Sequence, residues 1–192
     1  MPAICLIVWD MQKGIAPNAF NYHQILQNVK LLVEAARKAS LPVIFSQHTG
    51  LPSLYMSEYS RESLRRRGVD PSTARYMAEG SPEWAFVEGL TPTADDLVIR
   101  KHTPSFFVGT YLEQALRNRG VSTIVLCGVA TEVGIVGTAW HGAALGFIPI
   151  IVEDAVGGRA PETHEAALKV MGSIFRVVKT TEAVAMFEGK IG

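Results

Sequence analysis

The sequence predicts an α/β fold of three layers, in which helices cover both faces of a parallel sheet of about six strands. Short, continuous apolar runs alternate along the chain with segments whose apolar residues recur every three to four positions. The first pattern is typical of strands buried on both faces, and the second of amphipathic helices. Because strand and helix patterns follow one another in turn, the sequence favours repeated βα units.

The N-terminal part contains the first βα unit and the second strand. An apolar run from Ala3 to Trp9 ends at Asp10, and the segment from Asn21 to Ser40 has apolar residues at the 3.6-residue period of a helix. Residues Pro42 to Ser46 form a second, short apolar run. We therefore expect strand, helix and strand in this order, with Asp10 at the edge of the sheet.

A long polar segment, from Gln47 to about Glu79, follows the second predicted strand. Long connections in compact domains are usually functional, so we predict a binding loop or a lid, with some helix around residues 57–67. The basic run from Arg65 to Arg67 is typical of a solvated helix face. On a lid, the same run would attract an anionic substrate.

The second half of the chain continues the alternation. We predict a short helix over Ser81 to Leu90, a strand over Asp96 to Lys101, and a helix from Gly109 that Gly120 terminates. The central strand follows over Ser122 to Val129. The remaining predicted elements are a helix after that strand, a fifth strand over Ile148 to Glu153, a helix over Ala160 to Ser173, a sixth strand over Phe175 to Lys179, and a last helix to Phe187 capped by Thr181.

Length, charge and cysteine content limit the function. With 192 residues, 48% of them hydrophobic, the chain is expected to form one domain, residues 1–192. Eighteen basic and eighteen acidic residues cancel, which argues against nucleic acid or an anionic membrane as partner. Cys5 and Cys127 lie in apolar runs and suit reduced core thiols. Since the N-terminus has no signal-peptide pattern, we expect a cytoplasmic protein with a small-molecule substrate.

The stretch from Val121 to Gly146, VSTIVLCGVATEVGIVGTAWHGAALG, organises the chain. Its strand enters a sharp turn, GVATEVG, which leads into a helix. Such a turn places backbone amides and a helix N-terminus at the carboxyl end of a strand, where open parallel sheets bind ligands. Asp10 and Lys101 also end strands. Taken alone, Asp10 could simply cap the following turn, and Lys101 could extend into solvent. As a pair, they place a carboxylate beside a cation, and each shifts the proton affinity of the other.

Three blocks of sequence resemble the isochorismatase-like hydrolases, a superfamily of nicotinamidases, carbamoylsarcosine-type amidases and isochorismatases. The blocks are LIVWDMQKGI, VIRKHTPSFFVGTYLEQALRNRGV and GVATEVGIVGTA. The resemblance implies that Asp10 and Lys101 are the catalytic Asp and Lys, and that the Val129–Ala130 peptide bond is cis. It also implies that Gly134 stands where the amidases have a nucleophilic Cys. We therefore expect Asp10, Lys101 and the Gly134 amide to face one pocket.

Glycine at position 134 excludes a thiolate attack from that residue. Cys127 lies inside a strand seven residues upstream and is better explained as a core thiol. The hydroxyls of Ser122, Thr131 and Thr138 have no evident His base in the sequence. No side chain near the turn is thus a strong candidate for a nucleophile.

The resemblance offers a route without a nucleophilic side chain. Isochorismatases also have Gly at the turn, and there the matching Asp is thought to protonate an enol ether so that water can attack. This chemistry needs a proton donor, a cation to orient substrate carboxylates, and a pocket for one water. Asp10 and Lys101 fit the first two roles, with an Asp general acid or base as the leading hypothesis. An amidase-like enzyme in which water replaces the thiol, and a noncatalytic ligand-binding relative, remain as alternatives.

Further residues are assigned to substrate or oxyanion binding by their place at strand ends and by the resemblance. They are Gln47, His48, Val129, Ala130, Thr131 and Glu132. Trp9, beside Asp10, fits either the core or the pocket wall. The segment SQHTG lacks the Asp and the second His of the nicotinamidase-type metal cluster, so we expect no metal and no cofactor. Relatives commonly associate, which favours a homodimer or homotetramer.

Overall fold

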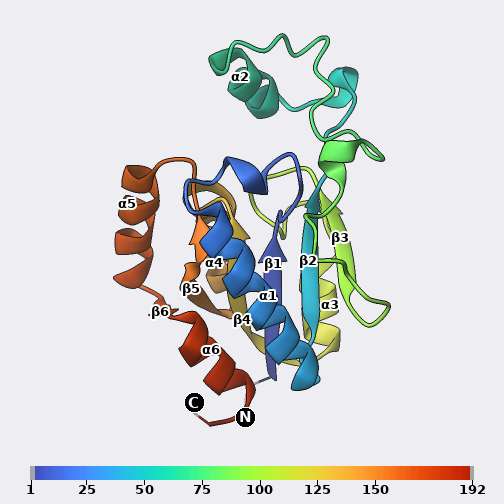
Figure 1. Cartoon of the computed structure of the whole chain (residues 1–192). Coiled ribbons are helices and arrows are strands. Elements are labelled where there is room, and N and C mark those ends of the chain that lie inside the picture. Colours follow the sequence, from blue (N-terminus) through green and yellow to red (C-terminus); the bar gives the residue numbers. More distant parts are fainter. Residues whose placement is uncertain (1–2, 191–192) are drawn as a thin grey trace.

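Six parallel strands form one sheet in the order β3-β2-β1-β4-β5-β6 (Figure 1). The computed structural model describes residues 3–190. The strands are β1 (Ala3–Trp9), β2 (Val43–His48), β3 (Leu97–Lys101), β4 (Val121–Val129), β5 (Ile148–Gly157) and β6 (Arg176–Val178). The helices are α1 (Tyr22–Lys38), α2 (Glu58–Arg66), α3 (Leu112–Asn118), α4 (Val136–Ala144), α5 (Pro161–Gly172) and α6 (Thr180–Phe187). The α/β class and the parallel sheet of six strands are confirmed.

Helices cover both faces of the sheet and bury two apolar clusters. Alternate residues of β1 belong to different clusters, because successive side chains of a strand point to opposite faces. Leu6 and Val8 pack with α1 and α6, whereas Cys5 and Ile7 pack with α3, α4 and α5. Figure 1 shows α1 and α6 in front of the sheet, with α3 on the far side. Both thiols lie in these clusters, as expected for core cysteines.

The strand order reverses between β1 and β4, and this point positions the site. From β1 the chain proceeds to β2 and β3 on one side, and from β4 to β5 and β6 on the other. A crevice forms at the carboxyl ends of strands at such a switch point, and ligands of open α/β sheets bind there. Asp10 directly follows β1, and Val129 ends β4 beside it in the sheet.

Residues 50–77, which we call the insertion, stand above the carboxyl ends of the strands and carry α2 (Figure 1). The insertion leaves and rejoins the body at one narrow neck. There the Gly50 N–H donates to the Met77 carbonyl at 2.8 Å, and a Cβ on Gly50 would lie 1.9 Å from the Tyr76 carbonyl oxygen. The helix predicted around residues 57–67 is confirmed.

Several predicted boundaries are wrong. The helix predicted from Gly109 begins at Leu112. Strand β2 continues through His48, and β5 continues through Gly157 because its last residues pair with the end of β4. The helix predicted over Ser81 to Leu90 is only a 3-10 turn at Pro82–Trp84, since the chain after it bonds to residues 11 and 13 instead.

The last helix begins two residues earlier than predicted, because Thr181 was expected to be its cap and Glu182 its first residue. Thr180 is its first residue, so Thr181 is not the cap. The hydroxyl and N–H of Thr180 donate to Asp154, and the N–H of Lys179 donates to Glu182 at 3.0 Å. Within residues 3–190, no helix has the length and apolar character needed to cross a membrane.

Candidate active site

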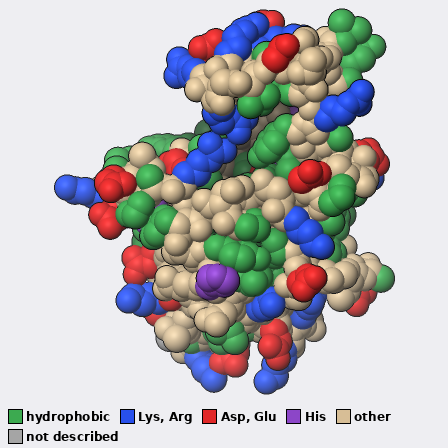
Figure 2. Space-filling model, turned by 45° about the horizontal axis from the view of Figure 1, so that its top comes forward, with side chains coloured by type: hydrophobic (Ala, Val, Ile, Leu, Met, Phe, Trp, Pro, Cys, Tyr) green, Lys and Arg blue, Asp and Glu red, His purple; other side chains and the backbone are tan. Residues whose placement is uncertain are grey.

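A cavity of about 540 Å³ lies between the carboxyl ends of the strands and the insertion. The ends of β1 to β4 and the residues just after them line its lower side, and residues of the insertion line its upper side. The loop after β5, with Gly158 and Arg159, borders it laterally. Figure 2 shows a hollow beneath the overhanging insertion, with Lys or Arg side chains at its edge.

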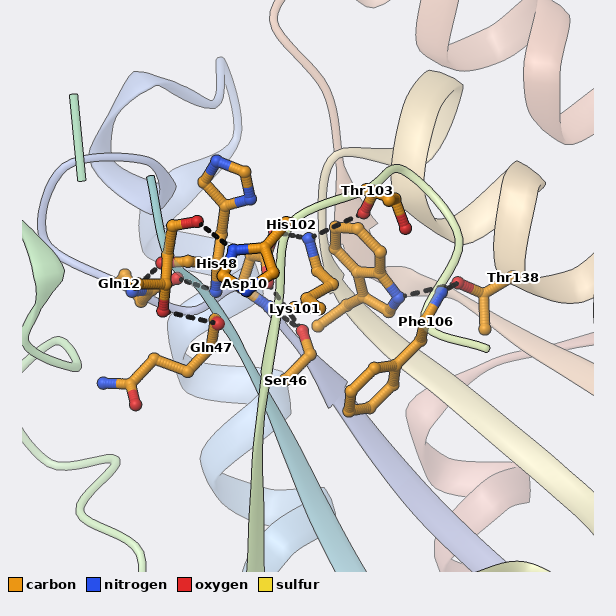
Figure 3. A network of polar contacts seen from close by, with 12 residues as sticks. Asp10, Gln12, Ser46, Gln47, His48, Lys101, His102, Thr103, Phe106 and Thr138 are labelled. Atoms are coloured by element: carbon orange, nitrogen blue, oxygen red, sulfur yellow. Dashed lines mark hydrogen bonds and ion pairs between the residues drawn. The ribbon is translucent and has the colours of Figure 1, made fainter. Parts of the chain in front are cut away.

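Asp10 is held in place at the edge of this cavity by two side chains from neighbouring elements (Figure 3). Its Oδ2 lies 2.7 Å from the ammonium of Lys101, and both side chains are almost fully buried. The Ser46 hydroxyl donates to Asp10 Oδ1 at 2.6 Å and accepts the Asp10 backbone N–H at 2.9 Å. The φ angle of Asp10 is 43°, a left-handed conformation in which Asp is one of the more frequent residues. The carboxylate is therefore fixed in both position and orientation.

The ammonium of Lys101 is surrounded by protein groups. Besides Asp10, it contacts the Thr103 carbonyl at 3.3 Å and lies 3.6 Å from the centroid of the Trp9 ring. Burial lowers the pKa of Lys101, while the adjacent Asp10 carboxylate acts in the opposite direction. Lys101 is thus directed at Asp10 rather than at the open part of the cavity.

The open part of the cavity carries other charged and polar side chains. Arg67 projects from the end of α2 and Arg159 from the loop after β5, and both are exposed. The Arg67 guanidinium lies 5.3 Å from the centroid of the Tyr76 ring. Burial and the positive charge of Lys101 lower the pKa of His48 to about 4, so its imidazole is neutral at pH 7. The cavity therefore offers two exposed cations and a neutral imidazole to a ligand.

The turn after β4 is a short π-helix, Thr131–Ile135, and the Val129–Ala130 peptide bond is cis, as the resemblance implies. The backbone N–H groups of residues 133–135 all donate to the Ala130 carbonyl, at 3.3, 2.9 and 3.1 Å. Gly134 itself is buried. The expectation that the Gly134 amide faces the cavity is therefore wrong, because a backbone carbonyl already accepts from that donor.

Comparison with known proteins now identifies the family. The family model of the isochorismatase domain matches residues 4–183. This chain belongs to the isochorismatase family. The uncharacterized isochorismatase family protein YwoC of Bacillus subtilis (strain 168) is 32% identical over 92% of this chain and 89% of its own length. The ureidoacrylate amidohydrolase RutB of Methylobacterium radiotolerans is 32% identical over 88% of this chain and 67% of its own.

A solved structure supports the same assignment. The cysteine hydrolase from Pseudomonas syringae pv. phaseolicola 1448A matches with a TM-score of 0.87 at 25% identity, over 98% of this chain and 93% of that one. The resemblance seen in the sequence is confirmed. The protein is a hydrolase of the isochorismatase family.

The isochorismatase-family cavity brings most of the expected residues together. Those that line it are Asp10, Lys101, His48, Val129, Ala130 and Glu132. Glu132 also accepts the backbone N–H of Arg159 at 3.2 Å and so ties the loop after β5 to the turn. Among the residues that the structure describes, three expected members do not line the cavity: Gln47, Thr131 and Gly134.

Strand alternation explains the position of Gln47. Because β2 continues through His48, successive side chains point to opposite faces, and only one of Gln47 and His48 can face the cavity. The Gln47 amide instead lies 3.3 Å from the Trp84 carbonyl, and Figure 3 shows it pointing away from Asp10. The expectation that Gln47 faces the substrate is therefore not met, whereas His48 does line the cavity.

Thr131 has a histidine partner that the sequence did not reveal. Its hydroxyl lies 2.9 Å from Nδ1 of His164, a residue of α5 that is distant in sequence. The Thr131 side chain is fully buried below the cavity wall. This pair consequently fastens α5 to the turn and is not placed to attack a ligand.

Two polar side chains near the ion pair were missed by sequence reasoning. Ser46 appears in the sequence only as the end of an apolar run, and its contact with Asp10 depends on the pairing of β2 with β1. Gln12 donates to the carbonyls of His48 and Trp84 and accepts the His48 N–H at 2.7 Å, which fixes the end of β2. The signal for Gln12 was its place two residues after Asp10.

Metal ligands are the remaining feature to consider. Across residues 3–190, no group of three or more His, Cys, Asp or Glu side chains is arranged to hold a metal ion. His48 and His102 both line the cavity, but the ring of His102 bonds to the Thr49 carbonyl at 2.7 Å. The Asp10–Lys101 pair and His48 can supply proton transfer and charge stabilisation to a ligand in the cavity.

Proposed function

We propose that this isochorismatase-family hydrolase cleaves a small carboxylated enol ether by adding water, without a covalent intermediate. The observation that carries the proposal is that position 134 offers neither a side chain nor a free backbone N–H to a ligand. Gly134 has no side chain, and its amide donates to the Ala130 carbonyl. A covalent acyl route needs a nucleophile and free donors for an oxyanion, and this turn offers neither at Gly134.

Asp10 supplies the proton transfer in this proposal. Its carboxyl group would donate a proton to the terminal alkene carbon, which leaves an oxocarbenium centre at the ether carbon. A water molecule then forms a C–O bond at that centre and returns one proton to the Asp10–Lys101 pair. Collapse of the resulting hemiketal releases an alcohol and a ketone, so that one water is consumed in all.

Lys101 is placed to return the proton that Asp10 donates in this proposal. An adjacent ammonium ordinarily favours an ionised carboxylate, which opposes a role as acid. Burial acts against this here, because it lowers the pKa of Lys101 and weakens its hold on the proton. The contact of 2.7 Å allows the pair to share that proton, so Lys101 can reprotonate Asp10 as the substrate carbon takes it.

The cations of the open cavity favour an anionic substrate. Arg67 and Arg159 line the cavity from two different elements, and guanidinium groups bind carboxylates in a bidentate manner. Substrate carboxylates would therefore contact these two side chains, a role that the sequence alone had given to Lys101. Asp10 lines the same cavity of about 540 Å³, so a small organic acid bound by these arginines would have its reacting bond near Asp10.

Hydrolysis in ²H₂O tests the proposal. Isochorismate is incubated with the protein, and the ketone product is examined by mass spectrometry and NMR. We expect one deuterium on the carbon next to the new carbonyl, and no product with Asp10→Asn. Absence of turnover on isochorismate and on related carboxylated enol ethers, together with ammonia release from N-carbamoyl compounds, would reject the proposal.

Hydrolysis of a C–N bond is the second candidate, and the RutB relative favours it. That protein is named an ureidoacrylate amidohydrolase and is 32% identical to this chain. In this alternative, Asp10 would act as a general base toward water, which attacks an amide or carbamoyl carbon. Arg67 and Arg159 would serve a carboxylated amide equally well. The same substrate panel, with nicotinamide and N-carbamoyl amino acids included, separates the two reactions.

A further inference from the structure

The indole of Trp9 takes the space beside Gly134 that a side chain at position 134 would need. A Cβ added to Gly134 would lie 2.2, 2.3 and 2.4 Å from three atoms of the six-membered ring of Trp9. Real Cβ atoms essentially never come closer than 3.0 Å to another heavy atom. Even alanine therefore requires the indole to move.

The indole is held on several sides. Its Nε1–H donates to the Thr138 hydroxyl at 2.9 Å, and that hydroxyl also accepts the Phe106 backbone N–H at 3.1 Å (Figure 3 labels Thr138 and Phe106). The ring face carries the Lys101 ammonium at 3.6 Å. Trp9 is only 3% exposed. Displacing the ring would break a buried hydrogen bond and remove an aromatic face from a buried cation, and each loss is costly in a dry site.

We propose that Trp9 determines the specificity of the site, because its indole fills the volume of a side-chain nucleophile and leaves water as the attacking group. Trp9 lines the cavity next to Asp10, so the wall at this point is an aromatic surface without an attacking atom. That water is the nucleophile rests on the proposed function. The steric exclusion of a side chain at position 134 by Trp9 does not depend on any substrate.

This arrangement makes Trp9 and Gly134 a coupled pair. With the indole in its present position, a side chain at residue 134 would collide with the ring, and without a side chain there the ring occupies that space. Lys101 depends on the same ring, because its buried ammonium lies 3.6 Å from the centroid of the buried indole. A side chain introduced at position 134 should therefore displace the Trp9 ring, and the displaced ring should in turn disturb the Asp10–Lys101 pair.

A double-mutant cycle on stability tests the coupling. Gly134→Ala is made in the parent and in Trp9→Leu, which lacks the six-membered ring, and thermal unfolding of all four proteins is compared. We expect Gly134→Ala to lower the unfolding midpoint of the parent by about 5 °C or more, and to have much less effect in Trp9→Leu. Gly172→Ala is the matched control, since its Cβ meets only Val177, at 3.6 Å.

Thiol labelling gives a second measurement that does not depend on activity. The native thiols, Cys5 and Cys127, are buried, and burial raises the pKa of both, so background labelling by iodoacetamide is slow. The thiol introduced by Gly134→Cys should label roughly tenfold faster or more when Trp9→Leu is also present, because the indole no longer covers it. Gly172→Cys, on an exposed helix end, provides the reference rate.

Each outcome decides the proposal. Equal costs of Gly134→Ala in both backgrounds, or equal labelling rates with and without Trp9→Leu, would overturn it. If a single Gly134 variant does not fold, recovery of folded protein in the Trp9→Leu background supports the proposal, and a lack of recovery overturns it. Neither measurement uses a substrate. A failure of the enol-ether hypothesis would therefore leave these results unchanged, and a failure here would leave the deuterium experiment open.

Discussion

The Lys101 ammonium lies 2.7 Å from Asp10 Oδ2, although the strands that end at these two residues are not neighbours in the sheet. Strand β2 runs between them, and its Ser46 hydroxyl contacts the other oxygen of the same carboxylate. Three strands thus meet at one carboxylate. Both charged side chains are removed from water, so each charge depends on the other for compensation.

The first prediction concerns this ion pair. Lys101→Met should lower the free energy of unfolding by about 3–5 kcal/mol, because it leaves the Asp10 carboxylate buried without its cation. Asp10→Asn combined with Lys101→Met should recover most of this loss, since neither group is then charged. Both proteins should be inactive. Urea unfolding and an activity assay provide the measurements, and a double variant no more stable than Lys101→Met would contradict the prediction.

Ser46→Ala provides a second prediction. The substitution removes a hydrogen bond to a buried carboxylate and leaves the Asp10 N–H without its acceptor, which should cost about 1.5–3 kcal/mol of stability. Asp10 should also lose orientation, so kcat should fall while KM changes little. The matched control is Ser122→Ala on β4, because the buried Ser122 hydroxyl has no hydrogen-bond partner within the described residues. An equal loss in both variants would argue against a specific role of Ser46.

A third prediction separates the cations of the cavity. Arg67→Ala and Arg159→Ala should each raise KM for a carboxylated substrate by roughly tenfold with a smaller effect on kcat, since under the proposed function these groups would bind the part of the substrate away from the reacting bond. Arg65→Ala is the control. Arg65 belongs to the same helix but contacts Glu58 and Glu62 on its exposed side. If Arg65→Ala raises KM as strongly, the substrate is attracted by the general charge of the insertion and not by the cavity cations.

The fourth prediction concerns pH. The pKa of His48 is lowered to about 4 from its ordinary value of 6.5, first by burial and then by the charge of Lys101. Between these values, the unfolded chain binds a proton that the folded chain does not, so stability falls as pH decreases through this interval. The His48 contribution to this fall is at most about 3–4 kcal/mol, since one pKa unit corresponds to about 1.36 kcal/mol.

His48→Gln should therefore flatten the decline of stability between pH 6.5 and pH 4. Chemical unfolding measured across this range checks the expectation. His23→Gln, on the exposed side of α1, controls for the loss of one histidine from the chain. An unchanged slope in His48→Gln would show that other groups cause the acid sensitivity.

Local sequence patterns predict most of the fold, and the errors occur where distant contacts decide. The apolar run of β5 ends at Val152, so the strand was predicted to end at Glu153. In the structure, Asp154 is satisfied inside the strand because Thr180 donates to its carboxylate and Asn28 to its carbonyl. The predicted helix after Ser81 is prevented by hydrogen bonds to residues 11 and 13. Neither partner can be identified from a short window of sequence.

The site was predictable to the extent that strand ends and the family resemblance define it. Asp10 and Lys101 needed only these two arguments, and their contact confirms the pairing. To predict where Gln47 points, one must know the exact end of β2. To predict that the Gly134 N–H donates to a backbone carbonyl, one must know that the turn is a π-helix. The position of the Trp9 ring beside Gly134 brings the last residue of β1 against the turn after β4, so it became visible only with the structure.

The narrow neck of the insertion has a consequence for redesign. Gly50 and Met77 join the two limbs at one point, so whatever lies between them forms a closed loop that the sheet does not have to accommodate. The entropy of closing such a loop grows slowly, by about 0.6 kcal/mol for each doubling of its length. We therefore expect the sheet and the Asp10–Lys101 pair to tolerate segments of different length and composition between these two residues, so that the upper wall of the cavity can be redesigned separately from its floor.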